Sequence, residues 1–289
     1  MRDARPAPPA LSRPASTVAA GPAPALSGKR RAPVLVVALA TTPVKGLHLC
    51  AREALMLERT GVAENRRFYL IDERARMVNG KMIGVLAAVR ADYESAAERL
   101  TMSFPDGSVV SDTVRLGADV ETRFFSRTPT ARLVEGPWSE AISAYSGRQL
   151  RLVRAEESRG GGVDRGLEGT VSLISTASVE HLEAIAGGHT VDARRFRMLI
   201  EVAGTDAHAE DLWVGHTVQI GQARVAFRGH VGRCLVTSQS PDSGLVDMPT
   251  LELLSYRRDL PTTEPLAFGV FGEVLKPGLV RLGDTVNPG

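Results

Sequence analysis

Residues 217–239 read TVQIGQARVAFRGHVGRCLVTSQ, and this stretch indicates the fold class. It reads as strands, with a tight turn at Ile220-Gly221. Glycines recur at positions 229 and 232, where a backbone without side chains can approach a ligand closely. One of only two cysteines in the chain, Cys234, follows directly after Arg233. We therefore expect a strand that carries a thiol into a site.

Strand patterns dominate the rest of the chain as well. VLVVALA at 34–40 reads as a buried strand, and short strands with turn signals follow it at close spacing. We expect three short helices, near 139–146, 176–186 and 248–258, and a flexible glycine-rich loop at 159–169. The predicted fold class is mainly β, a β-barrel with a few short helices. A change of pattern after residue 135 divides the chain into an N-terminal β module at 32–135 and a C-terminal barrel at 136–289.

Composition excludes several classes of protein. The 289 residues carry 35 Lys and Arg against 33 Asp and Glu, so the net charge of +2 gives no reason to expect nucleic acid or a membrane surface as a partner. No apolar stretch reaches the roughly 18 residues that a membrane helix needs. Two cysteines make no disulfide framework, which favours a reducing compartment and a cytoplasmic location.

The first 31 residues differ from the remainder in composition. They are rich in Pro, Ala, Ser and Gly and show no hydrophobic periodicity, which predicts a disordered tail. Their Arg and Ser content with almost no acid also fits a transit peptide, but the proline density argues against the amphipathic helix of such peptides. We expect a solvated tail.

Cys234 has two interpretations from its neighbours alone. It can be a small buried hydrophobe, since alternation would put Cys234 and Val236 on one face of a strand. It can instead be a reactive or metal-binding thiol, because a cation such as Arg233 favours the thiolate, and His230 is a candidate proton donor nearby. No second cysteine or histidine stands at zinc-site spacing, so a metal here would need its other ligands from a cofactor.

Further motifs occur in a fixed order along the chain. They are TPVKGL (42–47), VDARRFR (191–197, read as a strand with three arginines), AEDLWVGHTVQIG (209–221), Arg233-Cys234, SYRR (255–258) and FGVFGEVLKPGLVRLGDTV (268–286). Together they resemble the MOSC family, the molybdenum-cofactor sulfurase C-terminal domain, with its usual N-terminal β-barrel domain. The resemblance runs from about residue 33 to residue 286. It implies a MOSC N-terminal β-barrel-like domain at 32–135 and a MOSC domain at 136–289.

The resemblance also implies a cofactor and the residues that hold it. In this family a pterin dithiolene holds molybdenum, and the cysteine of the Arg-Cys pair ligates the metal. Cys234 would thus be the catalytic residue and the metal ligand. The molybdenum cofactor (Mo-molybdopterin) would be bound by Lys45, Gly46, Arg66, Ser175, Thr176, Arg197 and Arg233.

Elementary chemistry is consistent with these assignments. A pterin phosphate is a dianion, for which arginine offers a rigid fork and lysine a point charge. Ser175 and Thr176 begin a predicted helix, whose free N–H groups favour anions, although residues there can also serve only as helix caps. The chain departs from the family pattern at Leu199, where an asparagine is usual, and at Asn79 and Lys81, where a Thr-x-Arg followed by proline is usual. A polar cofactor atom facing Leu199 would lose a hydrogen-bond partner.

The resemblance implies a molybdenum-dependent oxidoreductase that reduces N-hydroxylated or N-oxide small molecules, as in the group that includes the amidoxime-reducing component of mitochondria. The chain has no cysteine cluster and no GxGxxG, so we expect electrons from a partner protein of the ferredoxin or cytochrome b5 kind. Two alternatives remain. Cys234 could carry a persulfide in a sulfur transferase or carrier, with Arg233 lowering the thiol pKa. The barrel could also serve a recruited, cofactor-free biosynthetic enzyme.

Overall fold

The structure is a computed structural model, and it describes residues 32–155 and 165–288. The predicted tail and most of the glycine-rich loop lie outside the described residues. The described residues form one compact unit. No helix within the described ranges is long and apolar enough to cross a membrane.

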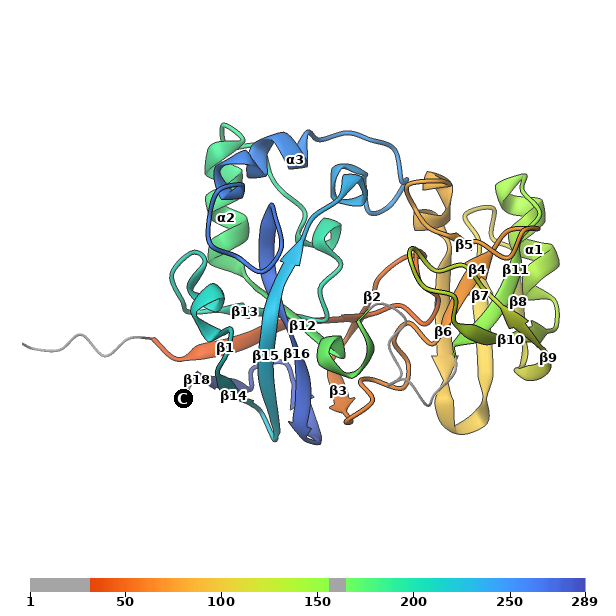
Figure 1. Cartoon of the computed structure of the whole chain (residues 1–289), viewed down its shortest axis with the longest axis horizontal. Coiled ribbons are helices and arrows are strands. Elements are labelled where there is room, and N and C mark those ends of the chain that lie inside the picture. Colours follow the sequence, from red (N-terminus) through yellow and green to blue (C-terminus); the bar gives the residue numbers. More distant parts are fainter. Residues whose placement is uncertain (1–31, 156–164, 289) are drawn as a thin grey trace, which may run out of the picture. The chain divides into compact units, whose positions relative to one another are not determined.

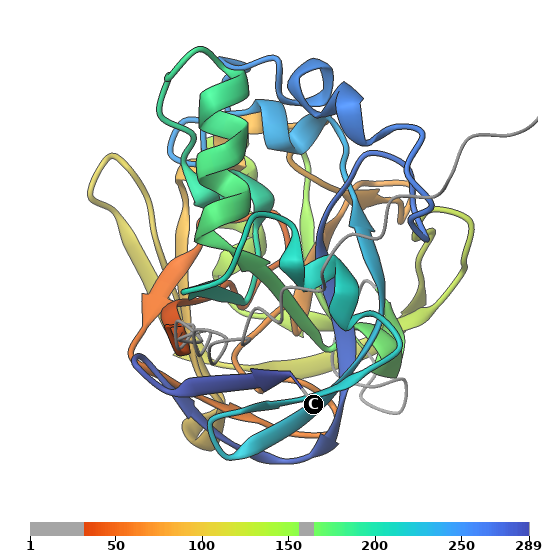
Figure 2. The same ribbon diagram turned by 90° about the vertical axis from the view of Figure 1, so that its left-hand side faces the viewer.

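Seven strands of the larger sheet close into a barrel (Figures 1 and 2), which confirms the predicted fold class. Only the pair β12–β13 is parallel. Alternate side chains point inward and make one apolar core, in which Val, Leu and Ile predominate. In their order around the barrel the strands are β1 (Val34–Thr41), β13 (Ile200–Ala203), β12 (Val171–Ser175), β16 (Ala267–Lys276), β15 (Ala223–Gly232), β14 (Thr217–Ile220) and β18 (Thr285–Pro288).

Two helices, α2 (Thr176–Ile185) and α3 (Thr250–Leu253), lie at the end of the barrel toward which β15 runs (Figure 1). They cover a second, smaller apolar cluster that includes Leu182, Phe196, Leu254 and Phe268. Several 3-10 turns complete the described chain: η1 (Gly84–Ala88), η2 (Ser95–Ala97), η4 (Gly166–Gly169), η5 (Ala193–Phe196), η6 (Ala209–Trp213), η7 (Leu235–Ser238) and η8 (Leu254–Arg257).

The N-terminal module packs two further sheets and helix α1 (Trp138–Ser146) around one apolar cluster, and the five-stranded sheet contributes to a second, smaller cluster. Trp138 is fully buried there, and its indole Nε1 donates to the carbonyl of Leu100 at 3.0 Å. The five-stranded sheet runs β5 (Met77–Val78), β4 (Phe68–Ile71), β11 (Arg151–Ala155), β10 (Thr130–Glu135) and β9 (Arg115–Glu121). The three-stranded sheet runs β6 (Arg90–Glu94), β7 (Arg99–Ser103) and β8 (Val109–Thr113).

The strand pairing crosses the predicted division at residue 135. β1 belongs to the N-terminal part of the sequence but closes the C-terminal barrel, and β2 (Cys50–Arg52) extends that sheet from β1. Strand β3 (Ala54–Leu57) pairs with β17 (Gly278–Arg281) near the other end of the chain. Conversely, α1 and β11 lie after residue 135 in the sequence, yet they pack with the N-terminal module. The two modules therefore exchange segments.

Candidate functional site

Cys234 lies just beyond the end of β15, not within a strand as the sequence predicted. Its side chain is exposed, so the interpretation as a small buried hydrophobe is wrong. Its carbonyl accepts from both the backbone N–H and the hydroxyl of Thr237, each at 3.0 Å, which turns the chain into η7. The neighbouring strand end is fixed by Glu264, whose Oε2 accepts from the N–H of Gly232 at 2.7 Å.

Cys234 lines a pocket of about 400 Å³. This volume is within the range of about 300–1,000 Å³ that is usual for small-molecule sites. Six residues predicted from the sequence line it: Lys45, Gly46, Arg66, Arg197, Arg233 and Cys234. They come from loops of both modules, and the sequence separation between Lys45 and Cys234 shows that only the tertiary fold brings them together. Ser175 and Thr176 are not among the lining residues.

The lining of this pocket is strongly cationic. Arg165, Arg194 and Arg195 join the four cations named above, and no aspartate or glutamate is among the described lining residues. Arg194 is paired with Asp192 and Asp242, and Arg195 with Asp247. A concave site with cationic walls attracts and orients an anionic group.

Arg66 and Arg197 are held in place by backbone carbonyls. Arg66 Nη2 donates to the carbonyl of Arg197 at 2.8 Å, and Arg197 Nη2 donates to that of Leu47 at 2.6 Å. Both residues have φ of 53°, in the left-handed region that residues other than glycine seldom adopt. Such backbone strain concentrates at functional sites. Because Arg197 ends η5 in this conformation, the VDARRFR motif forms a turn where the sequence predicted a strand.

Arg233 is anchored in the lining of the pocket. Its guanidinium donates to the carbonyls of Phe196, at 2.8 Å, and of Phe268. Burial and then the neighbouring Arg165 lower the pKa of Arg233 to about 9, so the group is still a cation at neutral pH. Its Nε is fully buried with no hydrogen-bond partner among the described residues, as is Oγ1 of Thr170 in the same lining. Buried donors without a partner are costly, so each needs an explanation such as a bound ligand or an ordered water.

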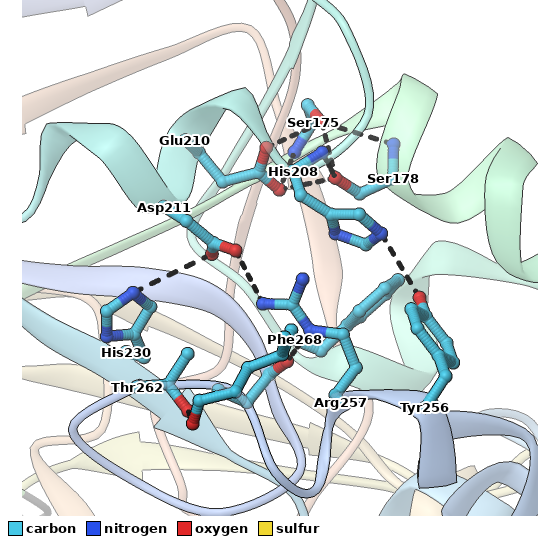
Figure 3. A network of polar contacts seen from close by, with 12 residues as sticks. Ser175, Ser178, His208, Glu210, Asp211, His230, Tyr256, Arg257, Thr262 and Phe268 are labelled. Atoms are coloured by element: carbon cyan, nitrogen blue, oxygen red, sulfur yellow. Dashed lines mark hydrogen bonds and ion pairs between the residues drawn. The ribbon is translucent and has the colours of Figure 1, made fainter.

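Ser175 and the helix it caps serve another part of the fold. Figure 3 shows the Ser175 and Ser178 side chains directed at the carboxylate of Glu210. Glu210 accepts from the Ser175 N–H at 3.1 Å, from its hydroxyl at 2.9 Å and from the Ser178 hydroxyl at 2.7 Å. Ser175 also caps α2 by accepting from the Ser178 N–H. The structure thus gives Ser175 a structural role, away from the pocket lining, and Thr176 is the first residue of the capped helix.

His230 also faces this network instead of the pocket. Its ring is buried, hydrogen-bonds with Thr263 and lies 3.9 Å from Oδ1 of Asp211 (Figure 3). Burial lowers the pKa of His230 below its ordinary value. The predicted role as a proton donor in the site is not supported, because His230 is not part of the pocket lining.

Two family sequence models match the chain. The MOSC domain matches residues 160–287, and the MOSC N-terminal beta barrel domain matches residues 34–135. Together these matches account for most of the chain, in the order that the motifs predicted. The chain belongs to the MOSC family.

The curated relatives of this MOSC chain are amidoxime-reducing components. It is 34% identical to "Mitochondrial amidoxime-reducing component 1" of Mus musculus over 121 residues, which are 39% of this chain and 35% of that protein. It is 23% identical to the protein of the same name in Xenopus laevis over 258 residues, 79% of this chain and 73% of the relative. "Mitochondrial amidoxime reducing component 2" of Rattus norvegicus is 25% identical over 273 residues, 84% of this chain and 78% of the relative. The mouse match thus spans about a third of that protein's length.

Sequence reasoning missed several residues of the MOSC pocket. Arg165 was read as part of a flexible loop, but it forms an ion pair with Glu264 and lies 4.3 Å from the centre of the Phe271 ring. Gln239 donates from Nε2 to the carbonyl of Gly80 at 2.9 Å and so joins the two modules at the pocket rim. Neither residue belongs to a motif, and a long-range contact leaves no periodic signal in a single sequence.

Proposed function

We propose that this protein is a molybdenum-cofactor-dependent oxidoreductase that reduces N-hydroxylated or N-oxide small molecules with electrons from a partner protein. The observation that carries the proposal is the exposed Cys234 thiol at a cationic pocket with unpartnered buried donors. The names of the relatives support the class of reaction. The substrate, the cofactor and the partner are part of the proposal.

The pocket fits a pterin cofactor in charge and in polarity. Arg66, Arg197 and Lys45 all line the pocket and would hold its phosphate, since arginine offers a phosphate a rigid fork and lysine a point charge. Arg233 Nε and Thr170 Oγ1 would each gain the partner that they lack. Cys234 would be the protein ligand of the metal; no group of three or more His, Cys, Asp or Glu that could hold a metal occurs among the described residues.

The leucine that departs from the family pattern does not face this pocket. Leu199 is buried in the barrel core, and its backbone N–H donates to the Ser172 hydroxyl at 3.0 Å. Ser172, Asn65 and Asn79 do line the pocket. The pocket therefore offers polar side chains to a cofactor, although Leu199 supplies none.

The proposed reaction takes an amidoxime, two electrons and two protons to an amidine and one water molecule. When bound, the cofactor supplies a metal that accepts electrons from the donor and passes them to the N–O bond. The chain holds the cofactor, and its pocket orients the substrate beside Cys234. For the electron donor we propose a ferredoxin- or cytochrome b5-like protein.

A turnover assay tests the proposal. Protein made in a host that supplies the cofactor is given an aromatic amidoxime and a chemically reduced viologen dye, and amidine is measured by chromatography. We expect amidine from wild type and from Cys50→Ser, since Cys50 lies outside the pocket lining, and none from Cys234→Ser. Equal activity of Cys234→Ser and wild type would contradict the proposed role of Cys234.

The exposed thiol also suits the persulfide alternative. A sulfur carrier would take one sulfur atom from the persulfide of a cysteine desulfurase, and the desulfurase would keep its own thiol. Intact-mass measurement after incubation with a desulfurase and cysteine separates the two functions. A gain of one sulfur atom on Cys234, in protein that holds no molybdenum, would favour the carrier.

A further inference from the structure

A cluster of two histidines and a tyrosine lies outside the pocket, at the end of the barrel covered by α2 and η8. His181 Nδ1 lies 3.0 Å from His208 Nε2, and the Tyr256 hydroxyl lies 3.1 Å from the same nitrogen. Figure 3 shows the His208–Tyr256 part of this cluster. None of the three residues lines the pocket or enters the proposed reaction.

One nitrogen cannot satisfy both neighbours. A neutral imidazole nitrogen carries either one proton or one lone pair in the ring plane, so His208 Nε2 can make one good hydrogen bond. Two polar atoms nevertheless approach it within about 3 Å. A cation placed among the three atoms would interact favourably with all of them.

The separations are close to those of metal ligands. Two nitrogen ligands, each about 2.0–2.1 Å from a zinc ion, lie about 3.4 Å apart at the tetrahedral angle. The observed separation of 3.0 Å needs only a slight opening, and the exposed His181 ring is the part able to move. The ring centres of His181 and His208 are 5.2 Å apart and the planes are inclined by 67°, so the rings do not block each other by stacking.

His208 is held rigidly, as a metal ligand should be. Its backbone N–H donates to the Ser178 hydroxyl at 2.8 Å, and its ring packs edge-on against Phe268. Its φ of 63° is a left-handed conformation, adopted at the N-cap of η6. Burial and then the Arg257 charge lower the pKa of His208 to about 4.

We propose that His181 and His208 bind a borderline divalent cation such as Zn²⁺, with Tyr256 as the flanking third donor. Imidazole nitrogen is a preferred ligand of Zn²⁺, Cu²⁺ and Ni²⁺, and water completes the coordination. Burial raises the pKa of Tyr256 to about 12, which makes the phenol the weaker ligand. The cation joins three distant segments, α2, the turn before η6, and η8, and so stabilises this end of the barrel.

The test is a Zn²⁺ titration of the full chain in the Cys234→Ser background, which removes the competing thiol of the pocket. We expect one equivalent of Zn²⁺ to bind and to raise Tm. His181→Ala should weaken binding at least about tenfold, and Tyr256→Phe less. His189→Ala, which removes another exposed histidine, is the matched control and should leave both readouts unchanged.

Because His181 is exposed, its loss should leave the metal-free Tm unchanged, and this separates a lost ligand from a damaged fold. Equal Zn²⁺ affinity of the His181→Ala variant and its parent would overturn the proposal. So would a Zn²⁺-dependent rise in Tm that persists in His181→Ala. Neither outcome depends on the molybdenum cofactor.

Discussion

Arg66 donates a hydrogen bond from Nη2 to the backbone carbonyl of Arg197 at 2.8 Å, although 131 residues separate them. Arg66 comes from the loop before β4 and Arg197 from the end of η5, so this contact joins the two modules at the pocket. One arginine thus positions the other. The cationic site depends on the association of both modules.

Arg66→Ala should reduce retention of the cofactor. A hydrogen bond to a charged group contributes about 1.5–3 kcal/mol, which corresponds to about 10–150-fold in affinity. Molybdenum that remains per protein after gel filtration measures the loss. Arg67→Ala is the control, because Arg67 Nε donates to the carbonyl of Ala63 and its side chain does not line the pocket. Equal losses in the two variants would contradict a specific role for Arg66.

Gly232→Ala should impair the site more than the fold. An added Cβ would lie 2.7 Å from Oε2 and 2.9 Å from Cβ of Glu264, which holds the strand end before Cys234. We expect amidoxime reduction to fall at least about tenfold, since a displacement of about 1 Å can cost far more than that. Gly107→Ala lies in an exposed turn with open space around it but with φ of 86°, so it should lose some stability to backbone strain and still keep full activity. Full activity of Gly232→Ala would show that the close approach of Glu264 to Gly232 is not needed for the reaction.

The buried Glu210 gives stability a defined pH dependence. Burial raises the pKa of Glu210 above its ordinary value of 4.5, so the folded state holds its proton to higher pH than the unfolded state does. This contribution is complete below about pH 4.5 and is lost as pH rises through the folded pKa. Urea unfolding of wild type and Glu210→Gln at pH 5 and pH 8 measures it.

We expect the wild-type advantage over Glu210→Gln to be larger at pH 5 than at pH 8. The difference between the two free energies of unfolding cancels the contributions of titratable groups that both proteins share. An advantage that grows with pH would mean that Glu210 is ionised in the folded protein across this range.

Asp211→Asn should be strongly destabilising. Oδ2 of Asp211 accepts from Nη2 of Arg257 at 2.5 Å, and the Arg257 side chain is almost fully buried. Removal of one partner leaves a buried charge uncompensated, at a cost of about 3–5 kcal/mol. Chemical denaturation measures the cost, with exposed Asp259→Asn as the control, expected within about 0.5 kcal/mol of wild type. A cost below about 1 kcal/mol for Asp211→Asn would show that the ion pair does not govern stability.

Local patterns predicted the parts of the fold that depend on local causes. The buried strand at 34–40 and the turn at Ile220-Gly221 both occur, because alternation and turn chemistry are properties of neighbouring residues. The end of β15 was missed, since the ladder stops after the Gly232–Ala267 pair while the apolar pattern runs on through Cys234. The exchange of β1 between modules leaves no local signal, because its partner β13 lies far along the chain.

The same limit applies to the site. Six predicted residues line one pocket because family motifs mark them. The sequence did not reveal the structural contacts of Ser175, because a helix start is compatible with both a cap and an anion site, and only the structure places Glu210 against it. Arg165 was missed because its partners Glu264 and Phe271 are distant in the sequence.

The central claim is that Cys234 ligates the molybdenum of a pterin cofactor. The most direct measurement is molybdenum per protein by elemental mass spectrometry, with pterin fluorescence after oxidation, for wild type and Cys234→Ser made in a host that supplies the cofactor. We predict close to one molybdenum and one pterin per wild-type chain, and a clear loss of metal in Cys234→Ser. Wild-type protein that contains neither molybdenum nor pterin would contradict the account.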